Sequence, residues 1–109
     1  DSASAANLGW TADFVITTTT TSNTHKVVCT DTTNEKIIGS VLMIDTDSSD
    51  ANVSYAAKLS DTISAIACNG STSGIAGTSF TLTAIKPDLW LIKGNILHTD
   101  NVTIPFSQS

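Results

Sequence analysis

Short runs of β-branched and apolar residues, each ended by a turn signal, follow one another along almost the whole of this sequence. Residues 79–85 (SFTLTAI) show the pattern best, because alternate apolar side chains fall on one face of an extended chain. The turn residues at 86–88 (KPD) then lead into a second run at 89–93 (LWLIK). Alternation of this kind predicts a half-buried β-strand with a further strand directly after it.

Comparable runs fill the rest of the chain, with a glycine inside one of them, Gly39, that suggests a bend or bulge. Strands separated by turns about every 8–12 residues are typical of sandwiches and barrels. We therefore predict a single all-β domain, an antiparallel β-sandwich or barrel of jelly-roll type. The further expected strands cover 13–19, 25–30, 37–45, 52–57 and 62–68, with one or two more within 96–106.

Two parts of the chain depart from this pattern. Residues 1–7 are small and polar and predict a flexible N-terminal arm, which leaves 8–109 as the β domain. Within 51–67 the apolar residues fall roughly at helical spacing, so one short helix there is the alternative to strands. Ser, Thr and Asp interrupt that spacing, and good caps do not bracket both ends.

Charge excludes two classes of partner. The formal net charge is −5 with only five basic residues, all of them lysines and scattered along the chain. A phosphate backbone or an anionic membrane surface requires clustered Lys and Arg. No apolar run approaches the length of about 20 residues that a membrane span needs. We therefore expect neither nucleic acid nor membrane as a partner.

Catalytic groups are sparse. His25 and Cys29 are four residues apart, which in a strand separates their side chains by about 13 Å along one face. Cys68 and His98 could meet only through tertiary folding, and no nucleophile motif surrounds them. We therefore predict a protein that is not an enzyme, with no catalytic residue and no cofactor.

A cluster of carboxylates is the stronger candidate for a metal site, because the two histidines and two cysteines lack the spacing of a zinc site. Asp45, Asp47 and Asp50 lie within the turn 45–50 (DTDSSD), which provides the oxygen ligands that Ca²⁺ prefers. The glycine and the bidentate glutamate of an EF-hand loop are missing, so a solvated turn is the favoured interpretation. Metal binding is not predicted.

The cysteines and aromatic residues offer structural candidates. Cys29 and Cys68 each end an apolar run, so they could form one disulfide, and two buried free thiols fit equally well. Trp10 follows the polar arm and is a candidate for an exposed contact. Trp90, inside an apolar run, and Phe106 are further candidates for an interface.

The C-terminal third resembles β-rich structural proteins of tailed-bacteriophage virions, above all capsid decoration (cement) proteins. The resemblance rests on 77–85 (GTSFTLTAI), on 89–95 (LWLIKGN) and on Pro105-Phe106, about a quarter of the chain. It implies a jelly-roll or related sandwich, a homotrimer, and binding to the major capsid protein at the virion surface. It carries over no active-site residue, because such proteins have none.

Two alternatives remain open. One is a small carbohydrate- or ligand-binding β module, for which Trp10 or Tyr55 would have to be exposed. The other is a pilin-like subunit, secreted or at the cell surface, for which a Cys29–Cys68 disulfide is expected.

Overall fold

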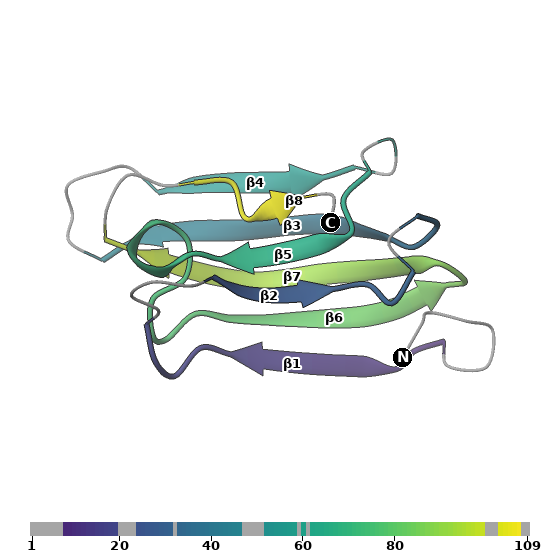
Figure 1. Ribbon diagram of the computed structural model, residues 1–109, viewed down its shortest axis with the longest axis horizontal. Coiled ribbons are helices and arrows are strands. Elements are labelled where there is room, and N and C mark those ends of the chain that lie inside the picture. The colour runs from purple at the N-terminus through teal and green to yellow at the C-terminus, as the bar shows by residue number, and fades with distance from the viewer. Residues whose placement is uncertain are drawn as a thin grey trace.

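The computed structural model describes residues 8–19, 24–31, 33–46, 52–58, 60, 62–99 and 103–107. The arm predicted for residues 1–7 lies outside these ranges. The described residues are mostly β-strand, with no helix other than one 3-10 turn, which confirms the all-β prediction for this part of the chain (Figure 1). The elements are β1 (Thr11–Val15), β2 (His25–Val28), β3 (Lys36–Asp45), β4 (Val53–Ala57), β5 (Ala65–Cys68), η2 (Gly70–Thr72), β6 (Ser79–Lys86), β7 (Leu89–His98) and β8 (Phe106–Ser107).

The strands form two sheets, which do not close into a barrel. The larger sheet has the order β1-β6-β7-β3-β4 and the smaller one β2-β5-β8. The smaller sheet lies in a second layer, in front of the larger sheet in Figure 1. The barrel alternative is therefore wrong. The antiparallel prediction needs a correction as well, because β3 and β7 pair in parallel over their whole length at the centre of the larger sheet.

The best-patterned strands form the centre of the larger sheet. β6 and β7 are an antiparallel pair joined by a tight turn in which Asp88 has a φ of 63°, a conformation that Asp tolerates better than most residues. β7 continues to His98 and so includes residues that the sequence assigned to a separate strand. Gly39 causes no bulge, because β3 keeps a continuous register with both β4 and β7 through this residue. The register shift in the β6–β7 pair lies between Ala84 and Lys86.

The helix considered for 51–67 is wrong for the described residues. β4 and β5 lie there instead. Along β4 the side chains of Val53, Tyr55 and Ala57 are at least half-buried, whereas Ser54 and Ala56 are exposed. This period of two fits a strand paired to β3, and tertiary burial therefore overrides the weaker helical spacing.

The core lies between the two sheets and receives side chains from both. The larger sheet contributes most of it, including Ile37, Val41, Phe80 and Ile92. The smaller sheet adds Ile66, Cys68 and Phe106 from its inner face, with Val27 and Cys29 packed beside them. Burial of these apolar side chains against one another is the main force that holds the two layers together.

Candidate functional site

One side of the molecule is open because two strand edges lie there together. β1 ends the larger sheet and β2 ends the smaller one, and each has a single paired neighbour among the described strands. Both strands lie at the lower border of their sheets in Figure 1. The smaller sheet extends only as far as β6 and leaves β1 uncovered. The inner face of β1 therefore lacks a covering strand within the described part of the chain.

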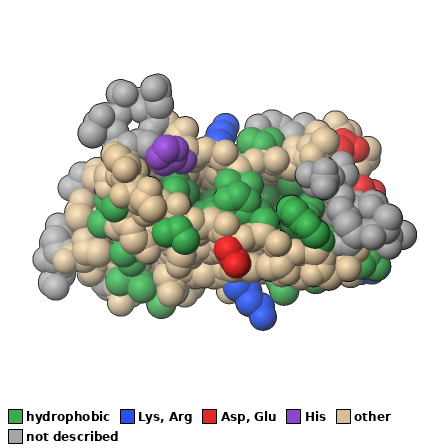
Figure 2. Space-filling model, turned by 90° about the horizontal axis from the view of Figure 1, so that it is seen from below, with side chains coloured by type: hydrophobic (Ala, Val, Ile, Leu, Met, Phe, Trp, Pro, Cys, Tyr) green, Lys and Arg blue, Asp and Glu red, His purple; other side chains and the backbone are tan. Residues whose placement is uncertain are grey.

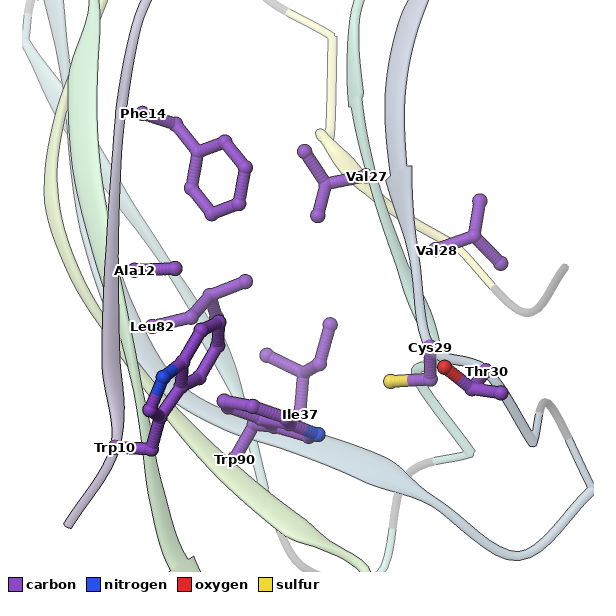
Figure 3. A pocket seen from close by; sticks show the side chains of 10 residues that line it. All are labelled: Trp10, Ala12, Phe14, Val27, Val28, Cys29, Thr30, Ile37, Leu82 and Trp90. Atoms are coloured by element: carbon purple, nitrogen blue, oxygen red, sulfur yellow. The ribbon is translucent and has the colours of Figure 1, made fainter. Parts of the chain in front are cut away.

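A groove follows this open side, which we call the β1–β2 groove. Its walls are Trp10, Ala12 and Phe14 on one side and Val27 and Cys29 on the other. Leu82 and Trp90 form the floor of a hollow of about 210 Å³ in this groove (Figure 3). A second and larger hollow, of about 540 Å³, continues the groove past Phe14 and Val27 to His25, Lys26 and Cys68. Figure 2, seen from the β1 side, shows hydrophobic side chains gathered along the middle of this face.

Aromatic contacts fix the shape of the groove. Trp10 packs edge-on against Trp90 with ring centroids 5.9 Å apart, and Phe14 stacks on Phe80 at 5.2 Å. Trp10 remains 47% exposed, whereas Trp90 is only 6% exposed. Trp10 is therefore available for a contact, while Trp90 supports it from below. Phe106, the third aromatic candidate, belongs to the buried core.

Glu35 holds one end of the groove and is the residue that sequence reasoning missed. Its carboxylate is buried and accepts hydrogen bonds from the Trp90 indole Nε1 at 2.8 Å and from the Asp31 backbone N–H at 2.9 Å. The first bond fixes the Trp90 ring and the second closes the turn before β3. A lone glutamate in a polar segment gives no sequence signal of such a role.

The two cysteines lie apart on the same sheet and are free thiols. Cys68 is paired with His25 in the β2–β5 register, whereas the Cys29 N–H donates to Ser64, at the opposite end of that ladder. Four residues of strand, about 13 Å, separate these two positions. A disulfide bridges Cα atoms less than about 7 Å apart, so the structure does not bring this candidate pair together.

Burial makes both thiols poor nucleophiles. Desolvation, together with the charge of Glu35, raises the pKa of Cys29 to about 11. Desolvation alone raises the pKa of Cys68 to about 11. The fold does place His25 opposite Cys68, a pair that the sequence did not consider. The protonated thiol is not the reactive species, so this pair does not form an activated nucleophile.

The aspartate turn lies mostly outside the described residues. Asp47 and Asp50 are not among them, and Asp45 ends β3, where its backbone N–H donates to the Asn52 side chain at 3.0 Å. In the ranges that the structure describes, no three His, Cys, Asp or Glu side chains come together as metal ligands.

Comparison of the chain with protein-family models, curated proteins and solved structures finds no match. Among the described residues there is also no helix of the length and hydrophobicity needed to cross a membrane. The β1–β2 groove is the feature of the described residues that bears on function.

Proposed function

We propose that this chain is a non-enzymatic structural protein of a virion, a capsid decoration (cement) protein that stabilises the shell through protein–protein contacts. The observation that carries the proposal is the β1–β2 groove, an apolar surface flanked by two strand edges without a second neighbour in the described chain. Edges of this kind accept further strands, and apolar grooves between them bind protein.

The finer fold belongs to the same proposal. We take the two layers as a jelly-roll-like sandwich, and the assembly as a homotrimer bound to the major capsid protein at the capsid surface. The residues that carry the resemblance support this, since 77–85 and 89–95 lie largely in β6 and β7. These two strands build the floor of the groove, with Leu82 and Trp90 on its surface.

A lack of catalysis agrees with the chemistry of the groove. Around the hollow of about 210 Å³ its walls are apolar apart from Thr30 and the Cys29 thiol, whose raised pKa of about 11 keeps it protonated at neutral pH. A surface of this composition binds apolar side chains, and the residues that line this hollow include no histidine, lysine or carboxylate that could transfer protons near pH 7.

One observation favours a second function, a ligand-binding module. Trp10 is half-exposed at the mouth of a hollow of about 210 Å³, and exposed Trp rings bind sugar and other flat apolar faces. In that case Trp10 fluorescence would shift on addition of soluble glycans. A binding role in protein assembly predicts no shift across a broad glycan panel.

A pelleting assay tests the proposed function. Purified chain is mixed with shells assembled from a candidate major capsid protein. We expect saturable co-sedimentation at a fixed ratio and a higher melting temperature of the shells. Trp10→Ala, which removes apolar area from the groove, should weaken this binding, and Leu42→Ala, exposed elsewhere on the larger sheet, should not. Absence of co-sedimentation of the unmodified chain would contradict the proposal.

A further inference from the structure

We propose that the β1–β2 groove is closed by a second copy of this chain, with β1 of one copy pairing in antiparallel fashion with β2 of the next. The inference deepens the proposed function, on which it rests for the biological role of the assembly. It specifies which edges meet, in which register, and which side chains select the contact.

The backbone leaves matching hydrogen-bonding groups on the two edges. Ile16 donates to Thr78 and accepts from Gly77, so residues of even number in the β1 segment face β6. Thr11, Asp13 and Val15 therefore direct their N–H and C=O groups away from the sheet. The Cys29 N–H donates to Ser64, so on β2 the free groups belong to Lys26 and Val28.

The directions of β1 and β2, and their positions along the strand axis, fit two copies related by a rotation about an axis parallel to the strands. β1 and β2 run in opposite directions in Figure 1, so such a rotation places β1 of one copy antiparallel to β2 of another. It also leaves each residue at its level along the axis. Phe14 and Val27 line both hollows of the groove and point toward each other in Figure 3. Phe14 of one copy therefore comes beside Val27 of the next.

This level sets the register of the new pair. With Phe14 beside Val27, Asp13 lies opposite Val28 and Val15 lies opposite Lys26. These four are the residues whose free backbone groups point across the edge, so the hydrogen-bonding pattern of an antiparallel ladder is satisfied without a shift.

Side chains on the outer face complete the contact. Val15 and Val28 are 62% and 42% exposed in the single chain, and in this register each would be covered by its neighbours across the junction. Asp13 and Lys26 become diagonal neighbours, a separation that a lysine side chain spans. The Asp13 carboxylate is already held on this face by a hydrogen bond from the Thr81 hydroxyl at 2.6 Å.

The same charges reject pairing of like edges. Asp13 is the only charged residue of β1, and Lys26 is the only lysine, arginine or acidic residue of β2. Two β1 edges paired about their centres would place the two Asp13 carboxylates opposite each other. Two β2 edges joined through the free groups of Lys26 and Val28 would place the two Lys26 ammonium groups opposite or diagonal to each other. Like charges opposite one another destabilise a strand pair, so only the pairing of β1 with β2 is favoured.

Burial of apolar side chains on the inner face of β1 provides the driving force for this contact. The uncovered inner side of β1 carries Ala12 and Phe14, with Trp10 just before it. Rotation about the axis places the open side of a second copy over these residues. The grooves then form one enclosed interior, which is mostly apolar and has His25 and Lys26 at the end of the second hollow. The contact closes as a ring, and three copies is the ring size that the proposed function implies.

Charge reversal tests the proposal in the intact chain. Asp13→Lys, Lys26→Glu and the double variant are compared with wild type by native mass spectrometry and light scattering over a concentration series. We expect wild type to form a closed oligomer. Each single reversal should raise its apparent dissociation constant about tenfold or more, and the double variant should restore it. Lys86→Glu, an exposed lysine at the far end of β6, is the matched control and should leave the oligomer unchanged.

Circular dichroism and thermal unfolding show whether each variant is folded. A wild-type monomer, or an oligomer that both single reversals leave intact, would overturn the β1–β2 contact. Loss of capsid binding by a chain that still forms this oligomer would contradict only the proposed function. A two-copy ring with the same charge dependence would support the contact and exclude the trimer.

Discussion

Glu35 is a charged residue that the fold buries and gives a structural role. It is the only glutamate of the chain and precedes an apolar strand, so a solvent-exposed loop position was the natural expectation. The fold buries it and gives its two carboxylate oxygens to the Trp90 indole and the Asp31 amide. The Asp31 amide is only four residues away, whereas the Trp90 indole becomes a partner only when β3 and β7 are paired.

Removal of this acceptor should destabilise the protein. Glu35→Ala leaves the buried indole N–H of Trp90 without its acceptor, which costs about 1–3 kcal/mol in the free energy of unfolding. Glu35→Gln keeps a side-chain oxygen and should cost less. Urea unfolding followed by tryptophan fluorescence measures both. Equal stability of Glu35→Ala and wild type would show that the two hydrogen bonds contribute nothing net.

Because the pKa values of the two thiols are raised in the folded chain, we expect the protein to lose stability at alkaline pH. Their pKa is about 11 in the folded chain against 9.0 for an unperturbed thiol. Between these values the unfolded chain releases protons that the folded chain retains, so stability falls as pH rises. We expect the cysteine contribution to be fully present below about pH 9 and lost toward pH 11. Thermal unfolding of wild type against Cys29→Ala and Cys68→Ala across this range isolates it.

Labelling provides a second test of the same thiols. A thiol-specific colorimetric reagent should find two free thiols per chain in denaturant and react slowly with the folded protein at pH 8. An intact Cys29–Cys68 disulfide in non-reducing mass analysis would contradict the strand register between β2 and β5.

Among the elements, those with clear alternation were predictable and those that depend on pairing partners were not. The runs at 79–85 and 37–45 agree closely with β6 and β3 because alternation and turn residues are local properties. The parallel pairing of β3 with β7 joins strands more than 40 residues apart in sequence, and no local pattern encodes it. The length of β7 was missed for a related reason, since Gly94 marks a close approach of β6 and not a strand end.

Gly39 marks the most sensitive point of the central strands. It has a φ of 119°, and a Cβ at this position would overlap the carbonyl oxygen of Ile92 on β7. We expect Gly39→Ala to lower the free energy of unfolding by about 2 kcal/mol or more through backbone strain and displacement of β7. Ser40→Ala, one residue further along β3 and exposed, should change it little. Chemical denaturation of both variants makes the comparison. Equal effects would show that β3 and β7 do not approach each other closely at Gly39.

For the whole molecule, the decisive property is the unequal size of the two sheets. The smaller sheet leaves β1 without a cover, and this mismatch creates the groove. Two of its residues were interface candidates from sequence, Trp10 from its place beside the polar N-terminal residues and Trp90 from its apolar run. Sequence analysis could not predict the groove itself, because β1 and β2 become neighbouring edges only through the packing of two separate sheets.

Substitution of the two tryptophans distinguishes an effect on self-association from an effect on the stability of the fold. Trp10→Ala removes a half-exposed ring whose edge-on contact with Trp90 contributes about 0.5–1.5 kcal/mol, so the chain should remain folded while self-association weakens. Trp90→Ala removes a buried ring and should cost about 3–5 kcal/mol of stability. Analytical ultracentrifugation and thermal unfolding of the two variants measure both effects. A Trp10→Ala protein that associates like wild type would place the contact away from the groove.

Hydrogen exchange at the backbone amides of β1 and β2 shows whether these two edges pair with each other between copies. The amides of Thr11, Asp13, Val15, Lys26 and Val28 point away from their own sheets, so in a single chain they exchange with solvent. We expect these amides to exchange slowly in the wild-type assembly and rapidly in the dissociated Asp13→Lys variant, while the Ile16 and Cys29 amides stay protected in both. Rapid exchange of all five edge amides in an intact wild-type assembly would contradict this pairing.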